Sequence, residues 1–402
     1  MPSSIWALGL VSLFMDLSSE TIHSLLPTFL VTTMGASLST LGSLEGLAEA
    51  TALIAKIFSG PLSDRIGRRK PLVVLGYSIG ALSKPLFALA GGLPLILGAR
   101  LIDRCGKGIR EAPRDALIAD LTPPAWRGRA FGLRQTLDNC GAVLGPLAAL
   151  LLMALTNGNF RFVFFCAAIP AGLAVGTLVW GVQGDCGGAE GAASGGEARE
   201  GTDLGVPKAS SRTPASISWR GFGSAFWFIS FAGALFQLAR FSEAFLIVRA
   251  NDLGLSSVQS PLVLVAMNVV YSFLAYPVGK LSDHWPRQWF LWGGLVVLGI
   301  ADLLLSLATG LPLVFLAILL WGFHLALTQG TLAAMVADTC PVERRGTAYG
   351  LFNLVSAAAL FVASAQAGVL WDYGGARLTF SVGAVLSFMS LIVFLIWEAR
   401  RV

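Results

Sequence analysis

Three ionisable residues lie inside the first apolar segment of this chain, at a spacing that brings them to one face of a helix. Asp16, Glu20 and His23 follow at i, i+4 and i+7, so at about 100° per residue they fall within roughly 60° of one another. A charged side chain at mid-bilayer costs on the order of 3 kcal/mol, and such residues normally face a protein interior or a wet cavity. We expect this face to line a transport route, and the alternative is structural pairing with cations of neighbouring helices.

Carboxylate oxygens and an imidazole are ligands that divalent transition metals accept, and Met15 adds a softer sulfur donor beside them. The predicted substrate site is therefore Asp16, Glu20, His23 and Met15, with a nickel, iron or cobalt ion as transported substrate. We expect no resident cofactor. The five cysteines are scattered without a CxxC pair, which argues against a thiolate metal site and a disulfide framework.

The second apolar segment repeats this pattern, because Glu45, Glu49 and Lys56 share a helix face within about 40°. A desolvated carboxylate can hold either a proton or a cation. Glu45 and Glu49 are therefore predicted to couple transport to protons.

A denser stripe of charge follows the fourth segment and suits anions. Its members are predicted to be anion contacts or ion-pair partners, and they are Arg100, Asp103, Arg104, Lys107 and Arg114. Such a stripe could bind a carboxylate anion or a metal held by a citrate-type chelator. The near balance of acids and bases in the first half equally fits a self-compensating ion-pair network. The second half is poorer in charge and is expected to offer Arg240, Glu243 and His324 to the cavity.

The composition is that of a protein that crosses a membrane many times. Of 402 residues, 55% are hydrophobic and 13% are charged, and the mean hydropathy is +0.72, which excludes a soluble domain. We predict an all-α integral membrane fold of twelve transmembrane helices in two pseudo-symmetric six-helix bundles. The expected spans are 5–33, 41–62, 71–90, 93–120, 131–154, 160–182, 219–250, 258–281, 289–308, 312–338, 348–370 and 378–396.

Two features divide the chain into halves. Residues 183–218 are rich in Gly, Ala, Ser and charge, and predict a flexible cytoplasmic linker between bundles 1–182 and 219–402. Motifs recur at one register: 60–65 returns as 279–284, and 119–132 returns as 337–350. Parallel repeats of this kind build one class of transporter, with the substrate site near the midplane between the halves.

Basic residues alternate between the two sides of the predicted membrane. One side holds Arg65, Arg68, Arg69, Lys70, Arg127, Arg129, Arg199, Lys208, Arg212, Arg287, Arg344, Arg345, Arg400 and Arg401. The other side has little beyond Arg161, Arg249 and Arg377. By the positive-inside rule both termini are cytoplasmic, and the expected location is a bacterial inner membrane. The expected partners are lipid, protons and a small ion or metal chelate, with no nucleic acid, and the protein is expected to be a monomer.

The segment 60–70, Gly-Pro-Leu-Ser-Asp-Arg-Ile-Gly-Arg-Arg-Lys, resembles the cytoplasmic loop motif of the major facilitator superfamily, and 141–146 resembles its helix-five glycine-proline motif. The resemblance covers the whole chain and implies the superfamily fold and alternating access. Its motif would gate by pairing a carboxylate with basic residues across the two halves. The gating residues carried over are Gly60, Asp64, Arg65, Gly67 and Arg68, with Asp283 in the second copy.

Within the superfamily, segments 6–20 and 106–116 resemble a bacterial branch that includes nickel-resistance exporters and an iron-citrate efflux protein. Two departures bear on that branch. Arg100 precedes Gly106 by six residues where the usual helix-four signature has four, and the chain ends at Val402 without a His-rich tail.

The sequence disfavours an enzyme and leaves two other transport functions open. An enzyme is disfavoured because the Glu20-x-x-His23 element has no second copy to complete a di-metal site, and no catalytic motif stands in a credible context. A multidrug or organic-cation exporter would use the aromatic residues of the second half, and an organic-anion symporter would use the basic stripe. We expect proton-coupled efflux, by alternating access, of a divalent metal or its citrate-type chelate.

Overall fold

The structure is a computed structural model that describes residues 3–66, 68–123, 126–182, 223–282, 284–338 and 345–399. The predicted linker 183–218, Gly67 and Asp283 lie outside the described residues. The helices of the first half are α1 (Ser3–His23), α2 (Leu26–Thr28), the π-helix η1 (Phe29–Thr33), α3 (Leu38–Ile66), α4 (Arg69–Leu89), α5 (Leu93–Leu121), α6 (Arg127–Leu155), α7 (Phe160–Cys166) and α8 (Ala168–Gly181). Those of the second half are α9 (Ser224–Ala239), α10 (Ala244–Asp252), α11 (Leu262–Ser282), α12 (Arg287–Leu307), α13 (Leu311–Asp338) and α14 (Arg345–Ala399).

The helix lengths fit twelve crossings of a membrane. Nine segments of the described chain are long and apolar enough to span one, and the longest, 350–396, has 47 residues, enough to cross twice. Its chain reverses at Gly375, whose φ is 69°. The two further long helices, α3 and α5, are not among the nine because they carry the densest charge. Counting 350–396 twice and adding these two helices gives the twelve predicted spans.

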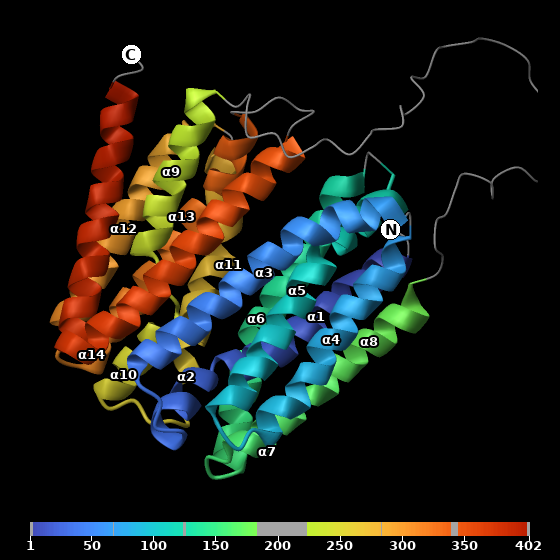
Figure 1. The fold of residues 1–402 in the computed structure, drawn as a ribbon, viewed down its shortest axis with the longest axis horizontal. Coiled ribbons are helices and arrows are strands. Elements are labelled where there is room, and N and C mark those ends of the chain that lie inside the picture. The colour runs from blue at the N-terminus through green and yellow to red at the C-terminus, as the bar shows by residue number, and fades with distance from the viewer. Residues whose placement is uncertain are drawn as a thin grey trace, which may run out of the picture.

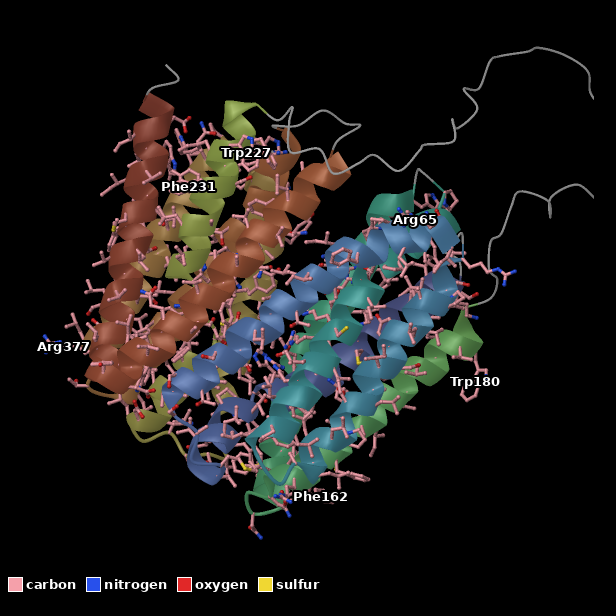
Figure 2. The ribbon with its side chains drawn as sticks, in the orientation of Figure 1. Arg65, Phe162, Trp180, Trp227, Phe231 and Arg377 are labelled. Atoms are coloured by element: carbon pink, nitrogen blue, oxygen red, sulfur yellow. The ribbon has the colours of Figure 1, made fainter. Side chains whose placement is uncertain are left out.

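The spans form two groups of helices that lie side by side (Figure 1). The start of α1 and the end of α14 lie at the same end of the molecule, and α2, α7 and α10 lie toward the other end. Large apolar side chains cover the outside, for example Phe231 at 62% exposure and Trp180 at 83%. Trp180 points away from the helices in Figure 2. An outward apolar surface is what a lipid-embedded helix bundle requires.

Helices α3 and α14 join the two halves by backbone contact. A Cβ at Gly42 would lie 2.1 Å from the Ser364 carbonyl oxygen, and one at Gly368 would lie 2.2 Å from the Leu38 oxygen. Only glycine permits that approach, as in other small-residue interfaces between membrane helices. We call this contact of Gly42 and Gly368 the glycine seam.

Polar contacts also join the two halves beside the glycine seam. The Asp372 carboxylate of α14 accepts from the amides of Leu38 at 3.1 Å and Ser39 at 2.9 Å, which are otherwise unpaired donors at the start of α3. Asn251, near the end of α10, donates to the Thr28 hydroxyl at 2.8 Å. These contacts lie toward the end opposite the chain termini, so the halves are joined there.

Candidate functional site

Close contact between α1 and α6 sets where the first-span carboxylates lie. A Cβ at Gly141 would stand 2.9 Å from the Asp16 Cβ, and one at Gly145 would stand 2.6 Å from the Glu20 Cβ. The helix-five glycine motif therefore lets α1 pack on α6 at the two positions from which Asp16 and Glu20 leave α1.

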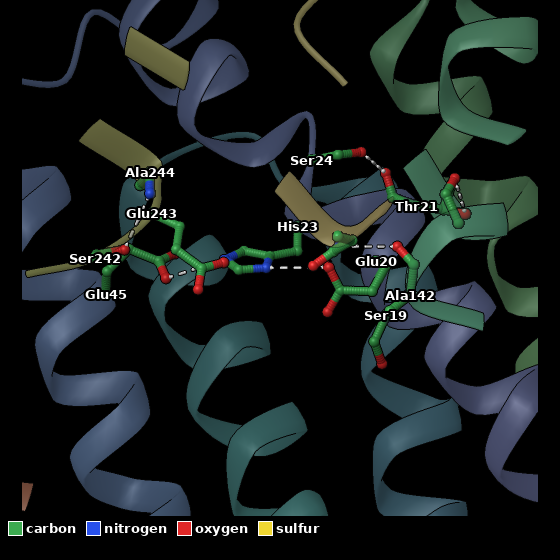
Figure 3. A network of polar contacts seen from close by, with 12 residues as sticks. Ser19, Glu20, Thr21, His23, Ser24, Glu45, Ala142, Ser242, Glu243 and Ala244 are labelled. Atoms are coloured by element: carbon green, nitrogen blue, oxygen red, sulfur yellow. Dashed lines mark hydrogen bonds and ion pairs between the residues drawn. The ribbon is translucent and has the colours of Figure 1, made fainter. Parts of the chain in front are cut away.

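His23 connects α1 to α3 through carboxylates on both sides of its ring. Its Nδ1 lies 3.5 Å from Glu20 Oε2 and its Nε2 lies 3.6 Å from Glu45 Oε2, and Figure 3 shows the ring between the two acids. Arg100 of α5 donates to the same Glu45 oxygen at 2.8 Å, and both side chains are 1% exposed. An imidazolium ring could donate to both acids at once, so this group forms a chain of alternating charge across three helices.

The same two helices, α3 and α5, carry two further ion pairs. Arg104 contacts Glu49 at 3.2 Å and Lys56 contacts Glu111 at 2.9 Å. The helices can approach because a Cβ at Gly108 would stand 2.4 Å from the backbone of α3. Each carboxylate predicted to couple protons thus has an arginine partner in this conformation.

Other members of the predicted stripe are held by structural pairs. Lys84 of α4 donates to Asp103 at 2.6 Å and to Ser19 at 2.9 Å. Arg114 is almost fully buried and donates to Ser12 at 3.2 Å. These contacts satisfy buried charge and tie α5 to α1 and α4.

Asp16 and Lys107 differ from this pattern. Within the described part of the chain, neither side chain has an ion pair within 4.0 Å or a hydrogen bond, and both are partly exposed. Lys107 interacts electrostatically with Asp16, Glu20, Glu49 and Glu111 without contacting any of them. One ammonium and one carboxylate therefore remain able to bind a solute and a proton.

The second half reaches this site at a break between α9 and α10. Residues 240–243 are not helical, and there Arg240 lies 3.6 Å from Glu243. Glu243 interacts electrostatically with His23 and Glu20 of α1, and Figure 3 shows it on the Glu45 side of the imidazole. The break thus brings charge of both signs toward the first-half cluster.

Several predicted site residues lie elsewhere. Met15 is fully buried and near Gly80 in the core between α1 and α4, so it is not a donor beside Glu20. His324 was expected on the cavity wall, yet it has 0% exposure because the rings of Phe236 and Trp321 surround it. No group of three or more His, Cys, Asp or Glu in the described segments is placed to hold a metal ion.

The predicted gate can be placed only in part. Arg65 lies exposed in the last turn of α3, Arg68 precedes α4, and Gly60 faces Ala112 of α5. The side chain of Asp64, like Gly67 and Asp283, is outside what the structure describes. The gating role of this motif stays a prediction.

Known proteins resemble this chain over its whole length. The family model described as Major Facilitator Superfamily matches residues 8–248 and 226–402. An uncharacterized MFS-type transporter of Methanocaldococcus jannaschii is 30% identical over 408 residues, which cover 98% of this chain and 95% of the relative. A multidrug resistance protein, MdtH of Aeromonas hydrophila, is 33% identical over 171 residues, 42% of this chain and 41% of that protein.

Solved structures share the fold at low sequence identity. A POT family transporter in complex with a thioalcohol conjugated peptide has a TM-score of 0.83 at 13% identity, covering 100% of this chain and 97% of that one. A bacterial homolog of the human lysosomal transporter Spinster, in an inward-facing and occupied conformation, has a TM-score of 0.76 at 16% identity, covering 98% and 96%. These structures bear on the fold alone, and none of the similar proteins bears on the nickel and iron-citrate branch.

Proposed function

This chain belongs to the Major Facilitator Superfamily, and from that premise we propose that it is a proton-coupled secondary transporter of small carboxylate anions, free or as metal chelates. The observation that carries the proposal is Lys107, a partly exposed ammonium without an ion pair among the described residues, beside the equally unpaired Asp16. In this assignment Lys107 binds the substrate carboxylate and Asp16 takes the proton.

Coupling follows from the proximity of these two charges. An anion on Lys107 is repelled by ionised Asp16, so protonation of Asp16 strengthens anion binding, and bound anion strengthens protonation to the same degree. Proton and anion then occupy the site together and cross in the same direction. This is symport, which the sequence leaves open for an organic anion, and it differs from the expected proton-coupled efflux of a metal.

A free divalent metal ion fits the site less well than an anion does. Glu20 and Glu45 face His23, and Glu49 faces Arg104, so a metal would have to displace cations already in place. A metal carried by citrate presents carboxylates instead, which suit Lys107. The expected nickel, iron or cobalt substrate is therefore retained only as a chelate.

Replacing Lys107 with methionine tests the assignment. The substitution removes a charge-assisted contact of about 1.5–3 kcal/mol, so the citrate concentration for half-maximal uptake should rise about tenfold to hundredfold. The measurement is uptake of labelled citrate, with and without nickel or ferric iron, into proteoliposomes under an imposed pH gradient.

Two controls accompany this variant. Lys107→Arg keeps the charge and should recover part of the affinity, while Lys280→Met removes an exposed lysine of α11 and should leave uptake unchanged. Equal loss in Lys107→Met and Lys280→Met would contradict the role of Lys107. If no carboxylate moves in any form while a lipophilic cation does, the proposal fails.

Multidrug export is the second candidate, and two observations favour it. A groove of about 620 Å³ lies between α6 and α11, with lining residues that carry no charge, among them Gln135, Asn139, Phe273 and Tyr276. Its volume is in the range of drug-binding sites. The partial similarity to MdtH points the same way. Transport of a lipophilic cation that is lost in Phe273→Ala but not in Lys107→Met would establish this alternative.

The setting of the transporter is part of the proposal. The twelve helices make the chain a multi-pass membrane protein, and the side rich in lysine and arginine would face the cytoplasm of a bacterial inner membrane. Both termini would then be cytoplasmic, and the glycine seam, at the opposite end, would close the space between the halves to the outside of the cell. A monomer suffices, since one chain supplies both halves.

A further inference from the structure

Two fully buried ionisable side chains in the second half have polar atoms without a hydrogen-bond partner among the described residues. Asp302 of α12 accepts a hydrogen bond from Trp321 Nε1 at 3.1 Å on Oδ1, and its Oδ2 has no partner. His324 of α13 faces the Gly294 carbonyl at 3.3 Å through Nδ1, and its Nε2 has no partner. Both residues have 0% exposure. Unpaired buried polar atoms are rare and need an explanation.

One indole joins these two groups and leads to the α9–α10 break. The Trp321 ring donates to Asp302 and lies 5.7 Å from the His324 ring, between centroids. Phe241, within the break, lies 6.4 Å from the same indole. A Cβ at Gly383 would stand 2.6 Å from Asp302 Oδ2 and 2.9 Å from the Phe241 ring. The carboxylate oxygen without a hydrogen bond and the Phe241 ring therefore both lie next to Gly383.

The surroundings favour the uncharged form of Asp302. No cation lies within 4.0 Å of its carboxylate among the described residues, and an ionised carboxylate without a cation is costly in such a place. The nearest titratable group on α13 is His324, which interacts electrostatically with Arg240. Helix α14 presents Gly383 and Ser387, whose hydroxyl donates to Leu295.

Gln237 of α9 supplies a further unpartnered polar atom, Oε1. It lies one residue from Phe236, whose ring is 5.6 Å from the His324 ring. Buried polar atoms without protein partners are usually met by ordered water. Water beside Gln237 and His324 would give protons a path to Asp302.

We propose that Asp302 and His324 form a second proton-binding site of this transporter, inside the second half and apart from Lys107. A proton delivered by water is held by the Asp302 carboxyl or the His324 ring. Loss of the proton from the Asp302 carboxyl leaves a carboxylate charge beside Phe241, which displaces that ring and moves the break that carries Arg240 and Glu243. The coupling role rests on the proposed proton-driven transport, whereas the proton on Asp302 is measurable without any substrate.

Infrared spectroscopy of the native protein in lipid provides the first test. We expect a carbonyl band of a protonated carboxylic acid that shifts in heavy water and is absent in Asp302→Asn. The variant keeps the hydrogen bond from Trp321, so its thermal midpoint should match the native one. The proposed proton-binding site is wrong if no carbonyl band can be assigned to Asp302, or if that band does not shift in heavy water. This conclusion does not depend on whether citrate is transported.

Transport provides the second test, and it separates coupling from structure. With equal citrate concentrations on both sides of the membrane, the rate at which Asp302→Asn exchanges labelled citrate should stay within twofold of the native rate. Accumulation under a pH gradient of one unit should fall about tenfold, because one proton fewer contributes about 1.4 kcal/mol less. His324→Gln should act in the same direction. Unchanged accumulation, or loss of exchange in a folded variant, would overturn the coupling role.

If the native protein moves no citrate, the proposed function has failed, and the infrared result alone decides whether Asp302 binds a proton.

Discussion

Replacing Gly42 with alanine is expected to reduce transport at least about tenfold. The added Cβ would lie 2.1 Å from the Ser364 carbonyl oxygen, so α3 and α14 must separate at the glycine seam. Overpacking costs about 1–3 kcal/mol, and about 1.4 kcal/mol changes an equilibrium tenfold. Because the proposed transport by alternating access requires this end to close once per cycle, the shift should slow every turnover. Uptake per molecule of reconstituted protein measures the loss.

A labelling experiment shows whether the seam itself has opened. A cysteine placed at Ser260, which is fully buried and bonded to Thr28, should react slowly with a maleimide in the native background and faster with Gly42→Ala. Gly98→Ala is the matched control, because a Cβ there meets nothing within 4 Å. Normal transport by Gly42→Ala, with labelling unchanged, would contradict the role of the seam.

Replacing Glu45 with glutamine is expected to lower the free energy of unfolding by about 3–5 kcal/mol, because removing one partner of a buried pair leaves the other charge uncompensated. Arg100 is 1% exposed and donates to Glu45 at 2.8 Å, and His23 loses the same carboxylate. The measurement is denaturant titration of the purified protein in micelles.

Two further variants test whether the loss of stability comes from the uncompensated charge of Arg100. Replacing both residues, by Glu45→Leu with Arg100→Met, should recover much of the lost stability, since apolar substitutes for a buried pair are often neutral or better. Glu111→Gln should cost at most about 1 kcal/mol, because Glu111 and Lys56 are 23% and 37% exposed. A small loss in Glu45→Gln, no larger than that in Glu111→Gln, would show that Arg100 is solvated or paired otherwise.

Hydropathy and turn residues predicted the spans well, because lipid demands long apolar helices whatever the tertiary contacts. The interval expected between 370 and 378 contains the reversal at Gly375. The break between α9 and α10 was not foreseen, although Arg240 and Glu243 were named as charges there. Residues 219–250 are mainly apolar, and mean hydropathy does not show where a helix is interrupted.

The face shared by Asp16, Glu20 and His23 did not become one site. His23 is seven positions after Asp16, about 10 Å along the helix axis, so different helices meet the two ends of this face. Asp16 faces α6 near Gly141, whereas His23 reaches Glu45 of α3. Angular spacing predicts a common face, but tertiary packing decides the neighbours at each level.

Charge pairing likewise could not be assigned from spacing alone. The basic stripe of α5 was predicted as a set, yet Arg100 and Arg104 are paired while Lys107 is not. Asp302 is the only acid of span 289–308 and was not among the predicted site residues. Its significance comes from Trp321 and Gly383, which are distant in sequence. His324 was expected on the cavity wall because an imidazole in a membrane usually faces water, but aromatic rings enclose it.

The direction of proton movement tests the central claim most directly. Citrate added outside proteoliposomes that hold a pH-sensitive dye, with no gradient imposed and the membrane potential clamped, should acidify the interior as proton and anion enter together. The signal should be lost in Asp16→Asn and weakened in Lys107→Met. Alkalinisation of the interior on adding citrate, or acidification that persists in Asp16→Asn, would contradict symport through Asp16 and Lys107.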